Sequence, residues 1–308
     1  MLTRWFALSL FVVATACTDG TRGNAVMTDA YQAEIAQWRA DRLERLREPY
    51  GWLNLVGLYW LEPGVQTLGS GADNSIRLPE SAAARIGSIS LDGTEAILKI
   101  EPGVAATIEG EAVSSALLVP DTAGEPTDVR LGTLAFRLIE RNGDYALRLW
   151  DFEHPAQKGF AGIPEFATDL NYRVRGTFEA YESPRVVRVG TVIEGLDYLP
   201  ESPGILRFAI HGEEQTLEVY ASGDSFFIVF ADATTGASTY PAGRFLYTEL
   251  PDESGATVID FNKAYNPPCA FNEFATCPIA SGRNRLDVAI SAGEKYSDDL
   301  HVDDPATH

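Results

Sequence analysis

The stretch from residue 65 to residue 108 reads VQTLGSGADNSIRLPESAAARIGSISLDGTEAILKIEPGVAATI. It consists of short apolar runs separated by Gly, Pro, Asp and Asn, which favour turns. The runs are Val65–Leu68, Ser75–Leu78, Ile86–Leu91, Ala96–Ile100 and Ala105–Ile108. Short runs at this spacing are typical of strands in a β-sandwich. We therefore expect a small all-β sandwich in this part of the chain.

This framework also resembles a forkhead-associated domain. The resemblance is carried by LGS (68–70), DNSIRLP (73–79), GSI (87–89) and IEG (108–110). Such domains bind phosphothreonine through an Arg that follows the first strands and a Ser-Arg-x-x-His run. No such run occurs here, and Arg85 stands alone before Ile86. The resemblance therefore implies a similar scaffold without the phosphopeptide site.

Residues 29–48 (DAYQAEIAQWRADRLERLRE) have the apolar period of an amphipathic helix. The apolar side chains that recur near one stripe are Tyr31, Ile35, Trp38 and Leu46, with Leu43 at its edge. Asp29 can serve as the N-cap, and Pro49 ends the helix. We expect this helix to pack against the sheet that follows it.

Apolar runs continue beyond a turn-rich connector at residues 115–128, and Asn142-Gly143 between two of them favours a hairpin. No segment after residue 50 shows a long helical period. We predict a mainly β protein. The helix and a small forkhead-associated-like sandwich occupy residues 28–128, and a larger antiparallel β domain occupies residues 129–297.

Residues 1–17 (MLTRWFALSLFVVATAC) have the features of a secretory signal. Arg4 supplies positive charge, and the apolar run Trp5–Val13 is too short to span a bilayer as a helix. The small residues before Cys17 resemble a bacterial lipobox, although Ala14 stands where Leu is usual. The alternative is an ordinary cleaved signal followed by an incidental Cys.

We expect the signal peptide, residues 1–16, to be removed and Cys17 to carry acyl chains. These chains would anchor the protein in a membrane of the bacterial cell envelope, facing the periplasm or the exterior. Residues 17–27 are mostly small and polar, and we expect them to form a flexible tether.

The formal net charge of −20 argues against nucleic acid as a partner, because phosphate backbones require clustered Lys and Arg. Part of this charge lies in an acidic tail, residues 298–308, which has few apolar residues. We expect that tail to remain mobile rather than to dock.

Three polar stretches lie close together in the last third of the chain. They read FFIVFADATTGASTY (226–240), GRFL (243–246) and IDFNKAYNPPCAF (259–271). With WL at 52–53, GL at 57–58 and WL at 60–61, they resemble the family of bacterial and archaeal proteins known as domain of unknown function 1684. The resemblance covers roughly residues 31–296 and implies no activity, because the family has none assigned. In this family a second Cys, here Cys277, is often followed by Pro-Leu-Pro-Pro, whereas this chain has PIAS at 278–281.

These stretches supply the residue types of a polar ligand pocket. Asp232, Asp260 and Glu294 provide carboxylates, and Arg244 could hold an anionic group with its planar fork. Side chains that could hydrogen-bond a ligand are those of Thr239, Tyr240, Asn262, Tyr265 and Asn266. We predict that residues 232–266, with Glu294 nearby, line one concave site for a small polar ligand or an envelope partner.

Other interpretations of this cluster remain open. Its residues could be scaffolding, because Asp and Thr side chains bond the backbone of turns and an Arg–Asp pair can join loops. The protein could be a hydrolase that uses Asp232, Asp260 or Glu294 with Arg244, or a structural protein that docks a partner. The sequence contains no Gly-x-Ser-x-Gly, His-Glu-x-x-His or phosphate-loop motif, and we expect no cofactor.

The remaining candidate residues are two cysteines and one histidine. Cys269 and Cys277 lie close together in an exported chain, which favours a disulfide over zinc, since the four His are scattered. His154 stands beside Pro155, and we interpret it as a turn residue rather than a base.

Overall fold

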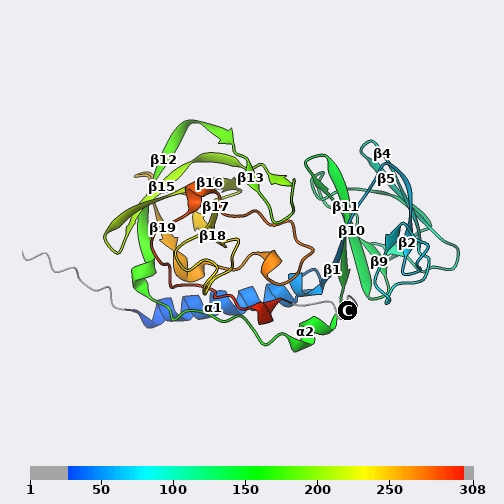
Figure 1. Cartoon of the computed structure of the whole chain (residues 1–308), viewed down its shortest axis with the longest axis horizontal. Coiled ribbons are helices and arrows are strands. Elements are labelled where there is room, and N and C mark those ends of the chain that lie inside the picture. Colours follow the sequence, from blue (N-terminus) through cyan, green and yellow to red (C-terminus); the bar gives the residue numbers. More distant parts are fainter. Residues whose placement is uncertain (1–26, 302–308) are drawn as a thin grey trace, which may run out of the picture.

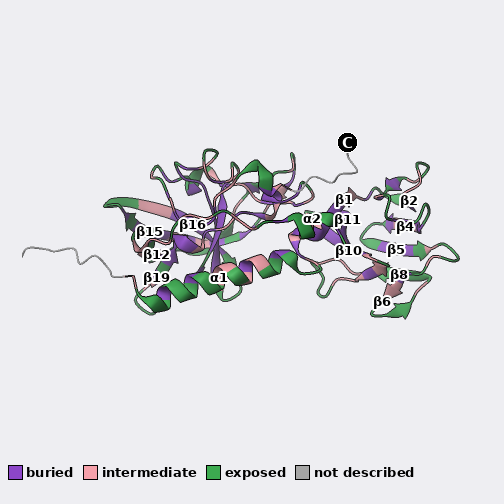
Figure 2. Ribbon diagram, turned by 90° about the horizontal axis from the view of Figure 1, so that it is seen from below, coloured by how far each residue is buried: buried purple, intermediate pink, exposed green. Residues whose placement is uncertain are grey.

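The structure is a computed structural model that describes residues 27–301, so the predicted signal peptide and Cys17 lie outside the described residues. Two β bodies follow each other along the chain, and the one long helix runs along the second of them (Figures 1 and 2). The prediction of a mainly β fold with one N-terminal helix is confirmed. Within residues 27–301, no helix is long and apolar enough to cross a lipid bilayer.

The first body is a sandwich of two sheets, with strand orders β1-β11-β10-β9-β6-β7 and β3-β2-β4-β5-β8. Alternating apolar residues of both sheets, such as Leu68, Ile89 and Leu147, fill one core between them. The strands are β1 (Leu55–Trp60), β2 (Gly64–Gly69), β3 (Ile76–Arg77), β4 (Gly87–Asp92), β5 (Glu95–Ile100), β6 (Thr107–Ile108), β7 (Glu111–Ala112), β8 (Ser115–Leu118), β9 (Val129–Leu131), β10 (Leu134–Arg141) and β11 (Asp144–Asp151).

The boundary between the two bodies falls later than the sequence predicts. Strand β9 pairs with β6 and β10, and β11 pairs with β1. Residues 129–151 therefore complete the first sandwich, and the predicted division between residues 128 and 129 is wrong. The hairpin at Asn142-Gly143 is confirmed, since both residues have the positive φ angles, 57° and 92°, that its tight turn requires.

The second body is a six-stranded antiparallel sheet of order β18-β17-β16-β15-β12-β19. The sheet curls so that its two edge strands meet, and the Thr248 hydroxyl of β18 donates to the Val258 carbonyl of β19 at 2.9 Å. The strands are β12 (Arg173–Val186), β15 (Glu201–Ile210), β16 (Glu213–Ser222), β17 (Ser225–Phe230), β18 (Arg244–Glu249) and β19 (Ala256–Asp260), with the small pair β13 (Val189–Gly190) and β14 (Asp197–Tyr198) beside them.

Period-two alternation gives this sheet two apolar faces. Ile228, Phe230 and Leu246 belong to the core on one face, together with residues of β15, β16 and β19. Phe227 and Phe245 belong to a second cluster on the opposite face, which the loop carrying Cys269 and Cys277 helps to cover. That second face bears the aromatic side chains discussed below.

Helix α1 (Asp29–Arg47) is confirmed, but two details differ from the prediction. Its N-cap is Thr28, whose Oγ1 accepts from the Tyr31 amide at 3.2 Å, rather than Asp29. Its buried stripe packs on the second body instead of on the sandwich that follows it in sequence, and the Tyr31 hydroxyl donates to Asp260 at 2.9 Å. Figure 2 shows the opposite face of α1 exposed.

Short helical segments connect these elements: η1 (Trp52–Asn54), α2 (Pro155–Gly159), η2 (Leu170–Tyr172), η3 (Phe261–Lys263), η4 (Pro268–Ala270), η5 (Gly282–Asn284) and η6 (Asp298–Leu300). The last of these corrects the prediction of a mobile tail from residue 298. Leu300 is buried against Phe160 and Phe271, so the tail docks up to that point, and residues 302–308 lie outside the described residues.

Candidate ligand-binding site

Arg244 and Asp232 form a buried ion pair that joins the ends of strands to the C-terminal loop. Arg244, 1% exposed, donates from Nη2 to Asp232 Oδ2 and to the Ile290 carbonyl, both at 2.9 Å, and from Nη1 to the Ala292 carbonyl. Desolvation lowers the pKa of Arg244, while Asp232 opposes that shift. The Arg244 guanidinium therefore acts as an internal clamp, meaning that it ties Asp232 to the C-terminal loop and does not face a ligand.

The second oxygen of Asp232 holds the turn that follows β17. Asp232 Oδ1 accepts from the Thr234 amide at 2.8 Å, from the Thr234 hydroxyl at 2.6 Å and from the Ile290 amide at 3.1 Å. The hydroxyls of Thr234 and Thr239 lie 3.0 Å apart. This is the turn that the Asp-x-Thr-x-Gly pattern favours, and it leaves neither Asp232 nor Thr239 facing an open site.

Glu294 is fully buried and joins the helix to the Asn266-Pro267 corner. Its Oε1 accepts from Arg42 Nε at 3.1 Å, and its Oε2 accepts from the Asn266 amide at 2.7 Å. Arg42 Nη2 also donates to the Asn266 carbonyl at 2.9 Å, and Asn266 Nδ2 donates to the Lys295 carbonyl at 2.8 Å. Burial raises the pKa of Glu294, and Arg42 opposes this rise.

Asp260 and Asn262 fasten the first turn of the helix. Both carboxylate oxygens of Asp260 accept from the Tyr31 hydroxyl at 2.9 Å, and Arg173 lies 3.5 Å from Oδ2. Asn262 Nδ2 donates to the Tyr31 hydroxyl at 3.1 Å and to the Asp169 carbonyl at 2.9 Å. Burial and Asp260 together raise the pKa of Tyr31.

The predicted polar site is therefore wrong for most of its members. Asp232, Thr239, Arg244, Asp260, Asn262, Asn266 and Glu294 are bonded internally and act as scaffolding. Tyr240 is half-buried and donates to the Cys269 carbonyl at 2.9 Å. Among the buried atoms of the cluster, Arg244 Nε and Asn266 Oδ1 have no partner within the described chain. Tyr265 is the predicted residue that faces a cavity.

The predicted disulfide is also absent. Cys269 and Cys277 are buried free thiols, and the Cys269 amide donates to Cys277 Sγ at 3.1 Å. Burial raises the pKa of Cys277. In residues 27–301 no three His, Cys, Asp or Glu side chains are grouped as metal ligands would be. His154 occupies the N-cap position of α2, at a turn as predicted, with both ring nitrogens buried.

A cavity of about 580 Å³ opens between α1 and the aromatic face of β17 and β18. We call it the aromatic pocket, and its lining residues are Trp38, Arg42, Arg45, Trp52, Phe227, Phe245, Tyr247, Tyr265 and Pro268. The rings of Tyr247 and Tyr265 are parallel, with an interplanar angle of 9° and centroids 6.4 Å apart. Phe245 stands perpendicular to Tyr265 at 5.8 Å, so the wall is a continuous set of ring contacts.

Two arginines of α1 give this pocket its charge. The Arg42 guanidinium lies 4.7 Å from the Tyr265 ring centroid and is fixed by Glu294, which neutralises it. Arg45 is exposed at the rim and forms no ion pair with any described residue. Burial raises the pKa of Tyr265, which therefore stays a neutral phenol at physiological pH. The pocket combines flat apolar surfaces with one uncompensated positive charge.

Trp38, Arg42 and Arg45 are not among the predicted site residues, although the sequence carries a signal for them. Trp38, Arg42 and Arg45 are spaced i, i+4 and i+7 along α1, so they share one face. Arg42 interrupts an otherwise apolar stripe, which predicts a buried partner of opposite charge. That partner, Glu294, could not be chosen by spacing alone because it comes from the far end of the chain.

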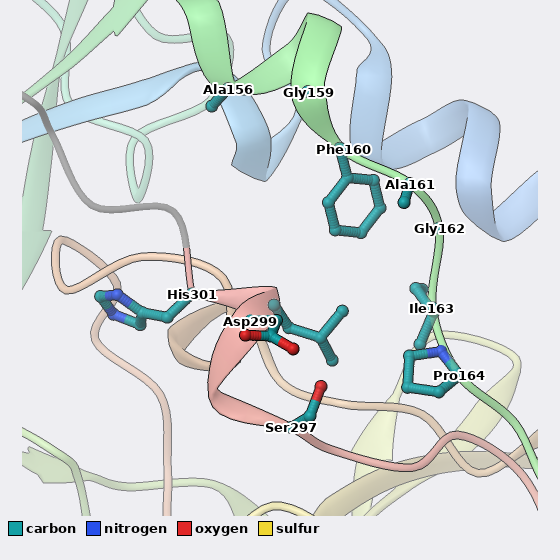
Figure 3. A pocket seen from close by; sticks show the side chains of 11 residues that line it. Ala156, Gly159, Phe160, Ala161, Gly162, Ile163, Pro164, Ser297, Asp299 and His301 are labelled. Carbon is teal, nitrogen blue, oxygen red and sulfur yellow. The ribbon is translucent and has the colours of Figure 1, made fainter.

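A larger hollow of about 810 Å³ lies where η6 meets the segment after α2 (Figure 3). Figure 3 shows the Phe160 ring and the side chains of Ile163, Asp299 and His301 around it. None of the predicted site residues lines this hollow, and its lining combines small side chains with the last residues that the structure describes.

Comparison with known proteins gives a family and no activity. No curated protein matches the chain by sequence. An uncharacterised protein of Haloarcula marismortui, from gene locus rrnAC0354 and solved by NMR, is 30% identical over 46% of this chain and 79% of its own, with a TM-score of 0.39. The FhaA FHA domain, solved in complex with the intracellular domain of Rv3910, is 20% identical over 30% of this chain and 96% of its own, with a TM-score of 0.22.

The family match covers the second body together with the segments that hold α1. Residues 158–295 match the family described as protein of unknown function, DUF1684, so the match is shorter than the predicted range of 31–296. It includes Tyr265 and Glu294, whereas Trp38, Arg42 and Trp52 lie outside it. Through residues 158–295, the chain belongs to the DUF1684 family.

Proposed function

We propose that this protein is a ligand-binding lipoprotein of the bacterial cell envelope and that its ligand enters the aromatic pocket. The observation that carries this proposal is the pocket itself, in which six aromatic side chains and Arg45 surround about 580 Å³ of open space. Concave, mostly aromatic cavities with a few polar groups are typical ligand sites. The predicted polar cluster supports the proposal indirectly, because its bonds hold α1 and the pocket wall in place.

The chemistry of the pocket favours a flat apolar group that carries a negative charge. Tyr247 and Tyr265 offer parallel ring faces, and the Trp38 ring is tilted by 55° against that of Tyr265. Arg45 provides a charge without a partner among the described residues, and a guanidinium pairs well with a carboxylate. We therefore assign aromatic carboxylates as the ligand class.

The hydrolase alternative receives no support from the carboxylates. The Asp232 and Glu294 side chains are 0% and 1% exposed, and Asp260 is held by Tyr31 and Arg173. A general base must reach the proton that it removes, and none of these groups faces the pocket.

The proposal is tested by titrating 2-naphthoate into the purified mature protein by calorimetry. The expected result is saturable 1:1 binding that weakens at least tenfold in Tyr247→Ala and in Arg45→Gln. Leu250→Ala is the matched control, because Leu250 is 47% exposed and Tyr247 is 48% exposed. The uncharged analogue 2-naphthylmethanol should bind more weakly than 2-naphthoate. Absence of binding, or equal binding by Tyr247→Ala, would contradict the proposal.

The envelope location rests on the sequence around Cys17, which lies outside the described residues. Mass spectrometry of the native N-terminus should find Cys17 carrying acyl chains. An unmodified N-terminus at another residue would remove the anchor while leaving the pocket proposal intact.

A further inference from the structure

A further cavity, of about 430 Å³, is lined by three arginines on a chain whose net charge is −20. Arg185 and Arg188 come from the end of β12 and the residues after it, and Arg283 comes from η5. We call this cavity the arginine pocket. Figure 1 shows β12 and β13 on the side of the second body away from α1, so the arginine pocket is separate from the aromatic pocket.

The fold holds two of these arginines in place. Asn284, which is fully buried, donates from Nδ2 to the carbonyls of Glu218 and Val229, each at 2.9 Å, and fixes η5 on the sheet. Arg283 therefore projects from an anchored turn. Arg185 donates to Glu218 Oε1 at 2.8 Å, and its guanidinium lies 3.9 Å from the Tyr181 ring centroid. Pre-organised donors of this kind lower the entropy cost of binding.

The guanidinium groups keep most of their donors available. The bonds of Arg185 use only Nη2, and the ion pair of Arg188 with Asp197 uses only Nη1. Arg283 has no ion pair with any residue between 27 and 301. Glu218 and Asp197 offset two of the three positive charges, so one charge remains in excess.

We infer that the arginine pocket binds a phosphoryl group. Arginine is the preferred side chain for phosphate oxygens, because its planar fork donates two parallel charged hydrogen bonds. The volume exceeds that of a phosphate ion alone and leaves room for the group to which the phosphate is attached. The same chemistry occurs in soluble phosphate esters and in phospholipid headgroups.

Two binding measurements distinguish a soluble phosphate ester from a phospholipid headgroup as the ligand. Glycerol 3-phosphate is titrated into the mature chain with calorimetric detection, and phosphatidylglycerol vesicles are tested by co-sedimentation with the chain lacking its acyl anchor. Whichever of the two, glycerol 3-phosphate or the vesicles, binds to the parent chain, we expect Arg283→Gln to weaken that binding about tenfold or more. Arg207→Gln, which removes an exposed arginine of the same sheet paired with Glu179, is the matched control.

The outcome of each measurement is decisive. Saturable binding of glycerol 3-phosphate that Arg283→Gln weakens identifies a soluble phosphate ester, and vesicle binding alone with the same sensitivity identifies a headgroup. The inference is overturned if neither measurement shows binding, or if Arg283→Gln and Arg207→Gln have equal effects. The circular dichroism spectrum of Arg283→Gln should match that of the parent chain, because Arg283 is exposed and bonds nothing in the core.

Discussion

Nε of Arg42 lies 3.1 Å from Oε1 of Glu294, and this ion pair joins positions 252 residues apart in the chain. Both side chains are buried, and Arg42 also forms one wall of the aromatic pocket. The pair therefore connects the helix that precedes the first sandwich to the loop that ends the second body, and it holds Arg42 against the Tyr265 ring in the pocket wall.

Removing Arg42 should destabilise the protein strongly. Arg42→Ala leaves the Glu294 carboxylate buried without its counter-ion, a change that costs about 3–5 kcal/mol in comparable buried pairs. Urea unfolding followed by tryptophan fluorescence measures the loss. The double variant Arg42→Met/Glu294→Gln should recover a large part of it, because no charge remains buried. If the double variant is no more stable than Arg42→Ala, the ion pair is not the reason for the loss.

The raised pKa of Glu294 predicts the direction in which the free energy of unfolding changes with pH. Burial raises the pKa of Glu294 above the ordinary value of 4.5, so the folded state binds this proton more tightly than the unfolded state. The stability gained from that proton is fully present below pH 4.5 and is lost as the pH rises through the raised pKa. Burial raises the pKa of Glu165 as well, and its contribution has the same sign.

The measurement is the free energy of unfolding in urea between pH 4.5 and 8. Glu294→Gln should flatten the decline with rising pH, whereas Glu214→Gln, which changes an exposed carboxylate, should leave the slope as it is. A slope that is equal in all three proteins would show that Glu294 titrates normally.

Arg244 should behave as a scaffold residue. Arg244→Met removes the partner of Asp232 and three bonds to carbonyl groups of the C-terminal loop. We expect a loss of about 3–5 kcal/mol in the free energy of unfolding. Arg207→Met, which removes an exposed pair with Glu179, should cost far less. Similar losses in the two variants would argue against the clamp.

The local structure, meaning the individual strands, the hairpin and the long helix, could be predicted from the sequence. Turn residues between short apolar runs predicted the strands of the first sandwich, and Asn142-Gly143 predicted its hairpin because only that turn chemistry tolerates two positive φ angles. The period of Tyr31, Ile35 and Trp38 predicted α1. Local signals decide these features, since they depend on residues a few positions apart.

Features that depend on distant pairings could not be predicted in the same way. Whether β11 pairs with β1 depends on contacts across some ninety positions, so the predicted domain boundary lies too early in the chain. Asp232, Asp260 and Glu294 have the composition of a binding site and of a buried scaffold alike. Only their partners, Arg244, Tyr31 and Arg42, distinguish the two, and those partners were set by tertiary packing.

The stability and binding roles should separate at Tyr247. This side chain is 48% exposed, and its ring stacks on that of Tyr265. Tyr247→Ala should therefore change the unfolding midpoint in urea only slightly, in contrast to Arg244→Met. A midpoint that falls as far as in Arg244→Met would show that the aromatic wall is structural.

The indole N–H signals of a ¹⁵N-labelled protein, recorded during a titration with 2-naphthoate, test the central claim most directly. Trp38 and Trp52 line the aromatic pocket, whereas Trp60 and Trp150 belong to strands of the first sandwich. We predict saturable shifts of the Trp38 and Trp52 signals, assigned by Trp→Phe variants, with Trp60 and Trp150 unmoved. Shifts confined to Trp60 or Trp150, or no shift in any indole signal, would contradict the assignment of the aromatic pocket as the ligand site.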